Sequence, residues 1–491
     1  MKKLIFILSL CLLSWVQAKS NTLIHTFSQH QLYPSKLVKR DTNSSSSTSI
    51  NYDAYSFNQP LDHKNQQSTT FQQRYWVNRD YYQSGGPVIL YNAGEYNAES
   101  VVPTIFDDSV FKLMAQKLNA MLIVIEHRFY GESYPKGLQS PQWSYLTIEQ
   151  SLEDMANFIR HGDQLKGIRF DCSPNKVKWI LRGGSYSGNL AAWMRYKYPD
   201  LVYAAVASSA PVQAEMDFYQ YYFPIMKYAP SKCAKGLNNV VLKIDDFLAK
   251  HPHPSQENSD FKKQFGLEDK ESDSEFALYA MNTALNFWQN SPPNENYLGD
   301  YICPIFQNSS DPNDHFKNYA EWVKGEVEYD KTEDNGSTTT NTKENDNDYY
   351  SSNVISFYHQ RCSELGYLPT SPPKTHPLYP RRIMSSLVNE DYWKNECKNK
   401  YQTPHNQVSN TNLNYRGWNL SISRTIWIEG EYDNWRELSV LSDANPIPRR
   451  NTTLEKYLVI PKGVHVFDFY VYDAINYLHD YTIKTLKDWL K

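Results

Sequence analysis

The sequence predicts an α/β fold in which a parallel sheet with helices on its faces is interrupted by a large, mostly helical insertion. Residues 50–212 alternate between short apolar runs, typical of buried strands, and longer amphipathic runs, typical of helices. Residues 213–415 lack strong strand-like runs and contain several helical windows, and strand-like runs return in residues 416–491. Strands that alternate with helices indicate a parallel sheet, and the interruption indicates an inserted cap.

The expected elements follow in chain order. Before the insertion, we expect strands at 87–91, 120–125, 177–181 and 201–207 and helices at 111–118 and 146–160. Within the insertion, we expect helices at 240–250 and 275–288 and, because it has almost no aliphatic side chains, a mobile polar loop at 330–353. After it, we expect strands at 424–428 and 457–460 and a closing helix at 471–490.

The N-terminus has the features of a targeting signal. Lys2 and Lys3 precede an apolar run, and small residues follow up to Ala18. This pattern predicts a cleaved signal peptide over residues 1–18, with a signal anchor as the alternative. Residues 19–49 contain a dibasic pair and a Ser/Thr-rich tract, so we expect a pro-segment or a flexible tract there. No later apolar run reaches the roughly 20 residues of a membrane span, and we expect no membrane anchor.

Sequons and cysteines agree with passage through the secretory pathway. The glycosylation sequons lie at Asn43, Asn308, Asn335, Asn419 and Asn451. Five cysteines remain once the signal is removed, which allows two disulfides and one spare thiol. The disulfide candidates are Cys233, Cys303, Cys362 and Cys397, with the pairing and the fate of Cys172 open. We expect a protein that is secreted, or delivered to the lumen of an acidic lysosome- or vacuole-like compartment.

Charge and composition narrow the function classes. The net charge is −4 without a long basic block, so we expect no nucleic-acid partner. No two cysteines are spaced like a zinc or redox pair, and no His/Glu pair has ligand spacing on a convincing helix, so we expect neither a metal nor another cofactor. A homodimer is one of the open oligomeric states.

A serine on a tight strand-to-helix turn is the first candidate catalytic residue. Ser185 stands in Gly183-Gly-Ser-Tyr-Ser-Gly188, between an apolar run and a helical segment. Such a turn pushes the hydroxyl clear of the backbone, as in the nucleophile elbow of α/β-hydrolases. Small flanking residues are needed because strand and helix nearly touch there. The strict pattern has glycine where this chain has Ser187, and a Gly/Ser-rich turn without catalytic function is the alternative.

A nucleophilic serine needs a base and an acid that orients the base. In α/β-hydrolases these follow late strands in the order serine, acid, histidine. Asp433 lies directly after the strand expected at 424–428, and His465 lies just after the last strand. Ordinary turn or surface roles are the alternatives for both, and nearby acids compete with Asp433: Glu429, Glu431 and Asp443.

Several motifs resemble those of prolyl carboxypeptidase, dipeptidyl peptidase II and the fungal acid prolyl endopeptidases, which form one family of serine peptidases. The motifs are Phe57-Asn-Gln-Pro-Leu-Asp-His63, Gly85-Gly-Pro-Val-Ile-Leu90, Ile125-Glu-His-Arg-Phe-Tyr-Gly-Glu-Ser133, Ala207-Ser-Ser-Ala-Pro-Val212 and Tyr358-His-Gln-Arg-Cys-Ser-Glu-Leu-Gly-Tyr367, together with those around Ser185, Asp433 and His465. The resemblance covers nearly the whole mature chain.

The resemblance implies an α/β-hydrolase core with a helical cap and hydrolysis of peptide bonds after proline or a small residue. It implies Ser185 as nucleophile, His465 as base and Asp433 as the acid that orients it. We expect oxyanion donors at Tyr186 and in the loop of Gly94. Two residues complete the expected site: Glu95, for a substrate amine, and Trp435, as the wall of a proline pocket. Ordinary core packing is the alternative for Trp435.

The chain departs from the family pattern in two places. Asp433-Asn-Trp435 lacks the proline that usually follows the acid, and the loop Asn92-Ala-Gly-Glu-Tyr96 matches the family's glutamate segment only loosely. Two other functions stay open: a lipase or esterase on the same fold, and a non-catalytic secreted glycoprotein.

Overall fold

An eight-stranded sheet forms the centre of the protein. The computed structural model describes residues 52–135, 143–270, 272–289, 302–336, 353–400, 403 and 407–491. The signal peptide, the tract 19–49 and the sequon at Asn43 lie outside the described residues. The strand order is β1-β2-β4-β3-β5-β6-β7-β8. This order, with the serine turn after β5, is the α/β-hydrolase arrangement, so the expected fold class is confirmed.

The strands are β1 (Tyr55–Pro60), β2 (Thr70–Asn78), β3 (Val88–Asn92), β4 (Met121–Ile125), β5 (Trp179–Gly184), β6 (Ala204–Ser208), β7 (Thr425–Gly430) and β8 (Glu455–Ile460). Strand β2 pairs antiparallel with both β1 and β4. The strands from β4 through β3 to β8 are parallel. The carboxyl ends of these parallel strands therefore meet at one edge, where α/β proteins place their sites.

The helices are α2 (Ala98–Asp107), α3 (Val110–Leu118), α4 (Ile148–Arg160), α5 (Tyr186–Lys197), α6 (Phe223–Tyr228), α7 (Ser231–Lys250), α8 (Gln256–Lys263), α9 (Asp273–Gln289), α10 (Pro312–Gly336), α12 (Glu390–Lys400), α13 (Val408–Tyr415) and α14 (Asn476–Leu490). Side-chain caps set several starts: Asn97, Ser109 and Thr147 each accept a hydrogen bond from a backbone N–H in the first turn of α2, α3 and α4. Each cap satisfies a donor that the helix itself leaves free.

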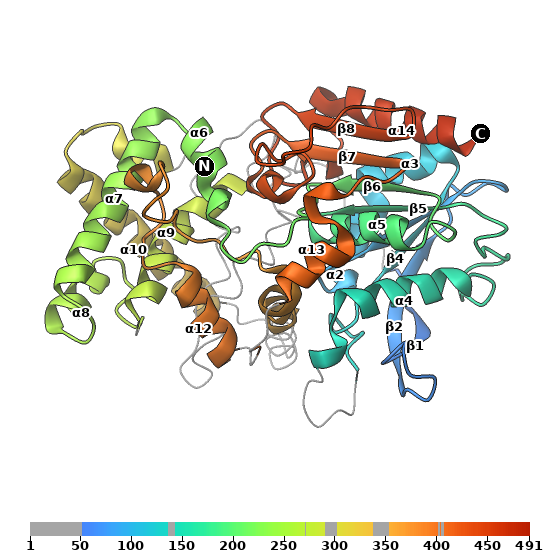
Figure 1. Cartoon of the computed structure of the whole chain (residues 1–491), viewed down its shortest axis with the longest axis horizontal. Coiled ribbons are helices and arrows are strands. Elements are labelled where there is room, and N and C mark those ends of the chain that lie inside the picture. The colour runs from blue at the N-terminus through green and yellow to red at the C-terminus, as the bar shows by residue number, and fades with distance from the viewer. Residues whose placement is uncertain are drawn as a thin grey trace.

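The sheet is packed on both faces, because its parallel strands are apolar on both sides. On one face, Ile89, Leu122 and Val206 form a core with side chains of α2, α3 and α14. On the other face, Leu90 and Ile123 join a second core with α4 and α5. Figure 1 shows α14 and α3 on one side of the sheet and α4 and α5 on the other.

A helical insertion separates β6 from β7. Helices α6 to α10, α12 and α13 all lie between these strands, and Figure 1 shows most of them as a separate mass beside the sheet. Among the described residues of this stretch, the only pairing of β type is an isolated bridge between Glu215 and Gly366. The buried side chains of the insertion continue the core under α4 and α5, so the cap and that face of the sheet share one apolar interior.

Three expectations about elements need correction. Strands β1 and β2 are not among the expected elements, and they pair antiparallel although a parallel sheet is expected. The tract expected as a loop from 330 begins inside α10, which extends to Gly336. The rest of that tract up to residue 352 lies outside the described residues. The closing helix starts at Asn476 rather than at 471, because two 3-10 turns precede it.

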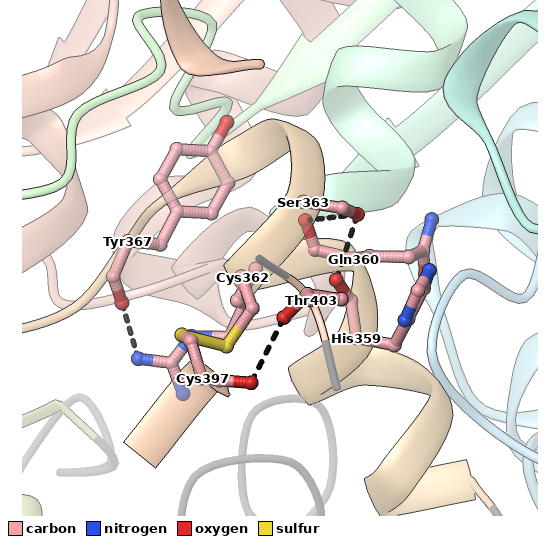
Figure 2. Close-up of a disulfide and its surroundings, with 8 residues drawn as sticks. His359, Gln360, Cys362, Ser363, Tyr367, Cys397 and Thr403 are labelled. Carbon is pink, nitrogen blue, oxygen red and sulfur yellow. Dashed lines mark hydrogen bonds between the residues drawn. A yellow bond between two sulfur atoms is a disulfide. The ribbon is translucent and has the colours of Figure 1, made fainter. Parts of the chain in front are cut away.

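The cysteines form two disulfides. Cys233 bonds Cys303 within the insertion, and Cys362 bonds Cys397, which joins the turn after residues 353–360 to α12 (Figure 2). Cys172 is free and buried. No helix in the described part of the chain combines the length and the apolar character that a membrane crossing needs.

Candidate active site

Ser185 stands at the sharp turn between β5 and α5. Its backbone has φ 57° and ψ −131°, a conformation that residues other than glycine rarely adopt. Its N–H donates to the carbonyl of Ser208 at 2.9 Å, which fixes the turn to the end of β6. A strained serine at a strand-to-helix turn is the local geometry that the sequence predicted, and such strain is a recurrent feature of functional sites.

The small residues around Ser185 are required by close contacts. A side chain at Gly183 would meet the carbonyl oxygen of Ser187 at 2.1 Å, and one at Gly188 would meet the carbonyl of Ser208 at 2.8 Å. Ser187, where the strict motif has glycine, is tolerated because its hydroxyl donates to the carbonyl of Asn92 at 2.5 Å. The departure from the motif thus ties the serine turn to the end of β3.

His465 and Asp433 lie side by side on the loops after β8 and β7. His465 Nδ1 is 3.0 Å from Oδ1 of Asp433 and 2.9 Å from Oδ2, and both side chains are fully buried. Asp433 also accepts the N–H of Trp435 at 2.8 Å. Since a carboxylate only accepts, Nδ1 carries the proton that this hydrogen bond needs, and Nε2 is the ring nitrogen that can accept a proton. Nε2 makes no hydrogen bond with the described residues.

The loop of His465 packs directly against the turn of Ser185. A side chain at Gly184, just before the serine, would meet Cγ1 of Val466 at 2.6 Å. The N–H of Val466 donates to Oγ of Ser209 at 2.9 Å, and Ser209 itself follows the Ser208 that binds the serine turn. The end of β6 therefore holds the serine turn and the histidine loop next to each other.

A buried ion pair also joins the strand that leads to Ser185 to the segment that follows His465. Arg182 on β5 binds the carboxylate of Asp468, and the hydroxyl of Ser208 donates to its other oxygen. Arg182 and Asp468 are each about 1% exposed. Burial strengthens an ion pair in a low-dielectric surrounding only when the partners are well matched, and here the carboxylate has a partner on each oxygen.

The structure distinguishes Asp433 from the acids that compete with it in the sequence. Glu429 is fully buried, and burial together with Asp433 holds its pKa well above the usual value, whereas the hydrogen bonds and the ion pair of His465 Nδ1 go to Asp433. Glu431 accepts the N–H of Lys462 at 2.9 Å, and Asp443 pairs with Arg436. Of the four acids, Asp433 is the one that binds the imidazole.

The expected oxyanion and amine-binding residues lie beside the first turn of α5. Tyr186 opens that helix, where the first N–H groups have no partner within the helix. A side chain at Gly94 would lie 3.9 Å from Cδ1 of Tyr186, so the loop after β3 touches this turn. The N–H of Gly94 already donates to Asn92 Oδ1 at 2.8 Å and would have to exchange that partner to bind an oxyanion.

Glu95 is a buried acid next to this turn. It is 3% exposed, and burial raises its pKa to about 8. Its Oε1 atom has no hydrogen-bond partner among the described residues. A buried carboxyl group without a cation beside it stays protonated, and an ammonium group placed there would favour its ionised form.

Trp435 packs against His465. Its ring centroid lies 6.0 Å from that of His465 and 5.5 Å from that of Phe218, while its indole N–H donates to Gln289 at 2.9 Å. Phe218 and Gln289 belong to the insertion, so the wall beside the histidine combines cap and core residues.

A cavity of about 650 Å³ opens next to this site, between α6, α7 and the segment after Asp433. Its lining includes Tyr228, Arg381 and Arg436, but none of Ser185, Asp433 and His465. Among the described residues, no three His, Cys, Asp or Glu side chains group as ligands for a metal ion. Asn308, Asn419 and Asn451 are exposed, whereas the side chain of Asn335 lies outside the described residues.

Three residues that hold the site together are not among those predicted from the sequence: Arg182, Ser209 and Asp468. Ser208-Ser209 at the end of a strand was the available signal, because polar residues at the carboxyl end of a parallel strand commonly serve a site.

The chain is similar to proteins of one peptidase family. The family model described as serine carboxypeptidase S28 matches residues 59–476. A Bipolaris victoriae protein named serine protease vicPb is 28% identical over 86% of this chain and 85% of its own. A Caenorhabditis elegans protein named as a serine protease is 32% identical over 82% of each chain. An Arthroderma benhamiae protein named as an extracellular serine carboxypeptidase is 27% identical over 85% of this chain and 63% of its own.

Among solved structures, a proline iminopeptidase of Mycobacterium smegmatis aligns with 89% of this chain and 99% of its own. The TM-score is 0.39 and the sequence identity is 11%. At that level of similarity the alignment says nothing about substrate.

Proposed function

The chain belongs to the serine carboxypeptidase S28 family and is a serine-type peptidase, and from that premise we propose that Ser185, His465 and Asp433 form its catalytic triad. The observation that carries the proposal is the buried contact between His465 Nδ1 and Asp433, at 2.9 and 3.0 Å, with Nε2 left free to accept a proton. The loop of this histidine packs on the turn that presents Ser185.

In the proposed reaction, His465 Nε2 takes the hydroxyl proton of Ser185 as Oγ attacks the carbonyl carbon of the scissile peptide bond. The imidazolium then gives that proton to the leaving amine nitrogen, the C–N bond breaks and an acyl-enzyme forms. Water next loses a proton to His465 and attacks the ester, and the proton returns to Ser185 as the carboxylic product leaves. Asp433 keeps the imidazole in the required tautomer throughout.

The negative charge on the tetrahedral intermediate needs donors close to Ser185. We propose the N–H of Tyr186 and a donor from the loop of Gly94. The first lies at the N-terminus of α5, where the helix dipole also favours a negative charge. One such donor is worth about 3–4 kcal/mol in the transition state.

The family resemblance, together with the aromatic wall at Trp435, supports cleavage next to proline or a small residue. A flat proline ring fits between aromatic side chains, and Phe218 and Trp435 place two of them near the base. Glu95 is proposed to bind the free amino group of a substrate. Burial raises the pKa of this carboxyl group, and the substrate's ammonium group would supply the positive charge that stabilises its ionised form.

We propose that the protein is secreted. The signal-like N-terminus, the two disulfides and the related protein named as an extracellular serine carboxypeptidase support this.

The test uses the purified mature protein with a proline-containing peptide and a fluorophosphonate probe. We expect the wild-type protein to react with the probe and cleave the peptide, and Ser185→Ala to do neither while its melting temperature is unchanged. Mass spectrometry of the products then gives the cleaved bond. A protein that hydrolyses a short-chain ester and leaves the peptide intact would instead be an esterase. Activity retained in the pure Ser185→Ala protein would remove Ser185 from the mechanism.

A further inference from the structure

One segment of the insertion is fastened to the sheet next to Ser185. Residues 353–360 are helical and lead into the turn Arg361–Leu365, which carries Cys362 of the second disulfide (Figure 2). The Oγ atom of Ser356 donates to the carbonyl of Phe129 at 2.9 Å. The hydroxyl of Tyr367 accepts from Asn189 of α5, also at 2.9 Å. This part of the insertion is thus bonded to the core at two separate points.

Gln360 is the residue of this segment that reaches the serine turn. Its Oε1 accepts the hydroxyl of Tyr130 at 2.5 Å, and its Nε2 donates to the hydroxyl oxygen of Tyr186 at 2.8 Å. All three side chains are buried. Both ends of the amide are therefore used, and they bind side chains from two different segments of the core.

The chain of hydrogen bonds continues to His127 with a fixed direction. His127 Nδ1 lies 2.7 Å from the carbonyl of Arg128, which can only accept, so Nδ1 carries the proton. Nε2 is then an acceptor, and at 3.1 Å it takes the hydroxyl proton of Tyr186. Burial lowers the pKa of His127 to about 4, which keeps this tautomer neutral above that pH. Along this chain, the hydroxyl of Tyr130 donates to Gln360, the amide of Gln360 donates to Tyr186, and the hydroxyl of Tyr186 donates to His127.

The side chain that these bonds fix belongs to the residue directly after Ser185. The backbone N–H of Tyr186 is one proposed oxyanion donor, so the orientation of this residue sets where that donor points. A Cβ added at Gly94, in the loop proposed to carry the other donor, would lie 3.5 Å from Cβ of Ser187 and 3.9 Å from the ring atom Cδ1 of Tyr186, so the ring borders that loop. Gln360 and His127 hold the hydroxyl of Tyr186 from two sides, at 2.8 and 3.1 Å.

We propose that Gln360 is a positioning residue for the oxyanion site: from the insertion, it fixes Tyr186 and through it the geometry of the two donors. The inference rests on the proposed function of Ser185. Gln360 acts through Tyr186, whose hydroxyl it binds from one side while His127 binds it from the other. A residue that only anchored the cap would change stability without changing transition-state binding, which is the difference that the experiment measures.

The experiment compares Gln360→Met, which removes both hydrogen bonds at similar volume, with Ser356→Ala, which removes a bond from the same helix to the core but leaves Tyr186 alone. The measured quantities are kcat and KM for a proline-containing peptide, the inhibition constant of a peptide aldehyde that forms a tetrahedral adduct, and the melting temperature. We expect kcat of Gln360→Met to fall by about tenfold or more with KM within twofold, and aldehyde binding to weaken in proportion. We expect Ser356→Ala to lower only the melting temperature.

Tyr186→Phe is the second variant, should Gln360→Met not fold. It keeps the backbone N–H and removes the hydroxyl that both partners bind, so we expect the same loss of kcat and of aldehyde affinity. The inference is overturned if kcat and aldehyde affinity are the same in all three variants, Gln360→Met, Tyr186→Phe and Ser356→Ala. If the wild-type protein does not react with a fluorophosphonate, the proposed function itself fails, which is a distinct result.

Discussion

Arg182, three residues before Ser185, forms a buried ion pair with Asp468, three residues after His465. The pair joins the strand that carries the proposed nucleophile to the loop that carries the proposed base. The hydroxyl of Ser208 completes the binding of the carboxylate from the strand between them. The relative position of the proposed nucleophile and base therefore depends on a charge interaction that neither of them makes.

Asp468→Asn should destabilise the protein and reduce activity together. The substitution leaves the buried guanidinium of Arg182 without a charge partner, at a cost of about 3–5 kcal/mol in the free energy of unfolding. Urea unfolding measures this change. Asp488→Asn, which breaks the exposed pairs of Asp488 on α14, is the control and should change nothing measurable. If Asp468→Asn left the free energy of unfolding unchanged, the ion pair would not be what holds β5 and the loop of His465 together.

Asp433→Asn should lower kcat by about 10⁴-fold with a near-native melting temperature, because the amide favours the wrong tautomer of His465. Glu429→Gln is the matched control: an isosteric change at a buried acid whose raised pKa keeps it neutral. We expect its kcat within about twofold of wild type. The reverse pattern would assign the orienting role to Glu429.

Glu95 should make the protein less stable as the pH rises. Its pKa of about 8 in the folded state exceeds the usual value near 4.5, so between these values the unfolded chain has lost the proton and the folded chain keeps it. The free energy of unfolding then falls by about 1.4 kcal/mol per pH unit on account of this residue. Glu95→Gln should remove that part of the slope. Unfolding curves at pH 5, 6 and 7 measure it, and parallel slopes for both proteins would contradict the prediction.

Gly183→Ala should unfold or severely weaken the protein, because the added methyl group would lie 2.1 Å from the carbonyl oxygen of Ser187. We expect a loss of about 3 kcal/mol in the free energy of unfolding. Gly325→Ala is the contrasting change: nothing lies within 4 Å of its added methyl group on the exposed side of α10, and alanine favours a helix. Thermal unfolding of both variants tests whether close packing is the reason that position 183 requires glycine.

The sequence predicted the parallel strands well, since β3, β4 and β5 are short apolar runs that stand out from their surroundings. Strands β1 and β2 escaped detection because each is partly exposed and their alternation is interrupted by polar side chains such as Gln59 and Gln73. Those two glutamines are buried and bind each other, a pairing that only the folded strands reveal.

By itself, the sequence determined the order of the parallel strands, the serine turn and the two loops that follow late strands, because apolar periodicity and small residues express local physics. Only the tertiary structure decided which acid binds His465, that the N–H of Gly94 is engaged by Asn92, and that Gln360 of the insertion holds Tyr186. These contacts join residues far apart in the chain, and whether two side chains meet depends on the packing of the whole core, which no local pattern encodes.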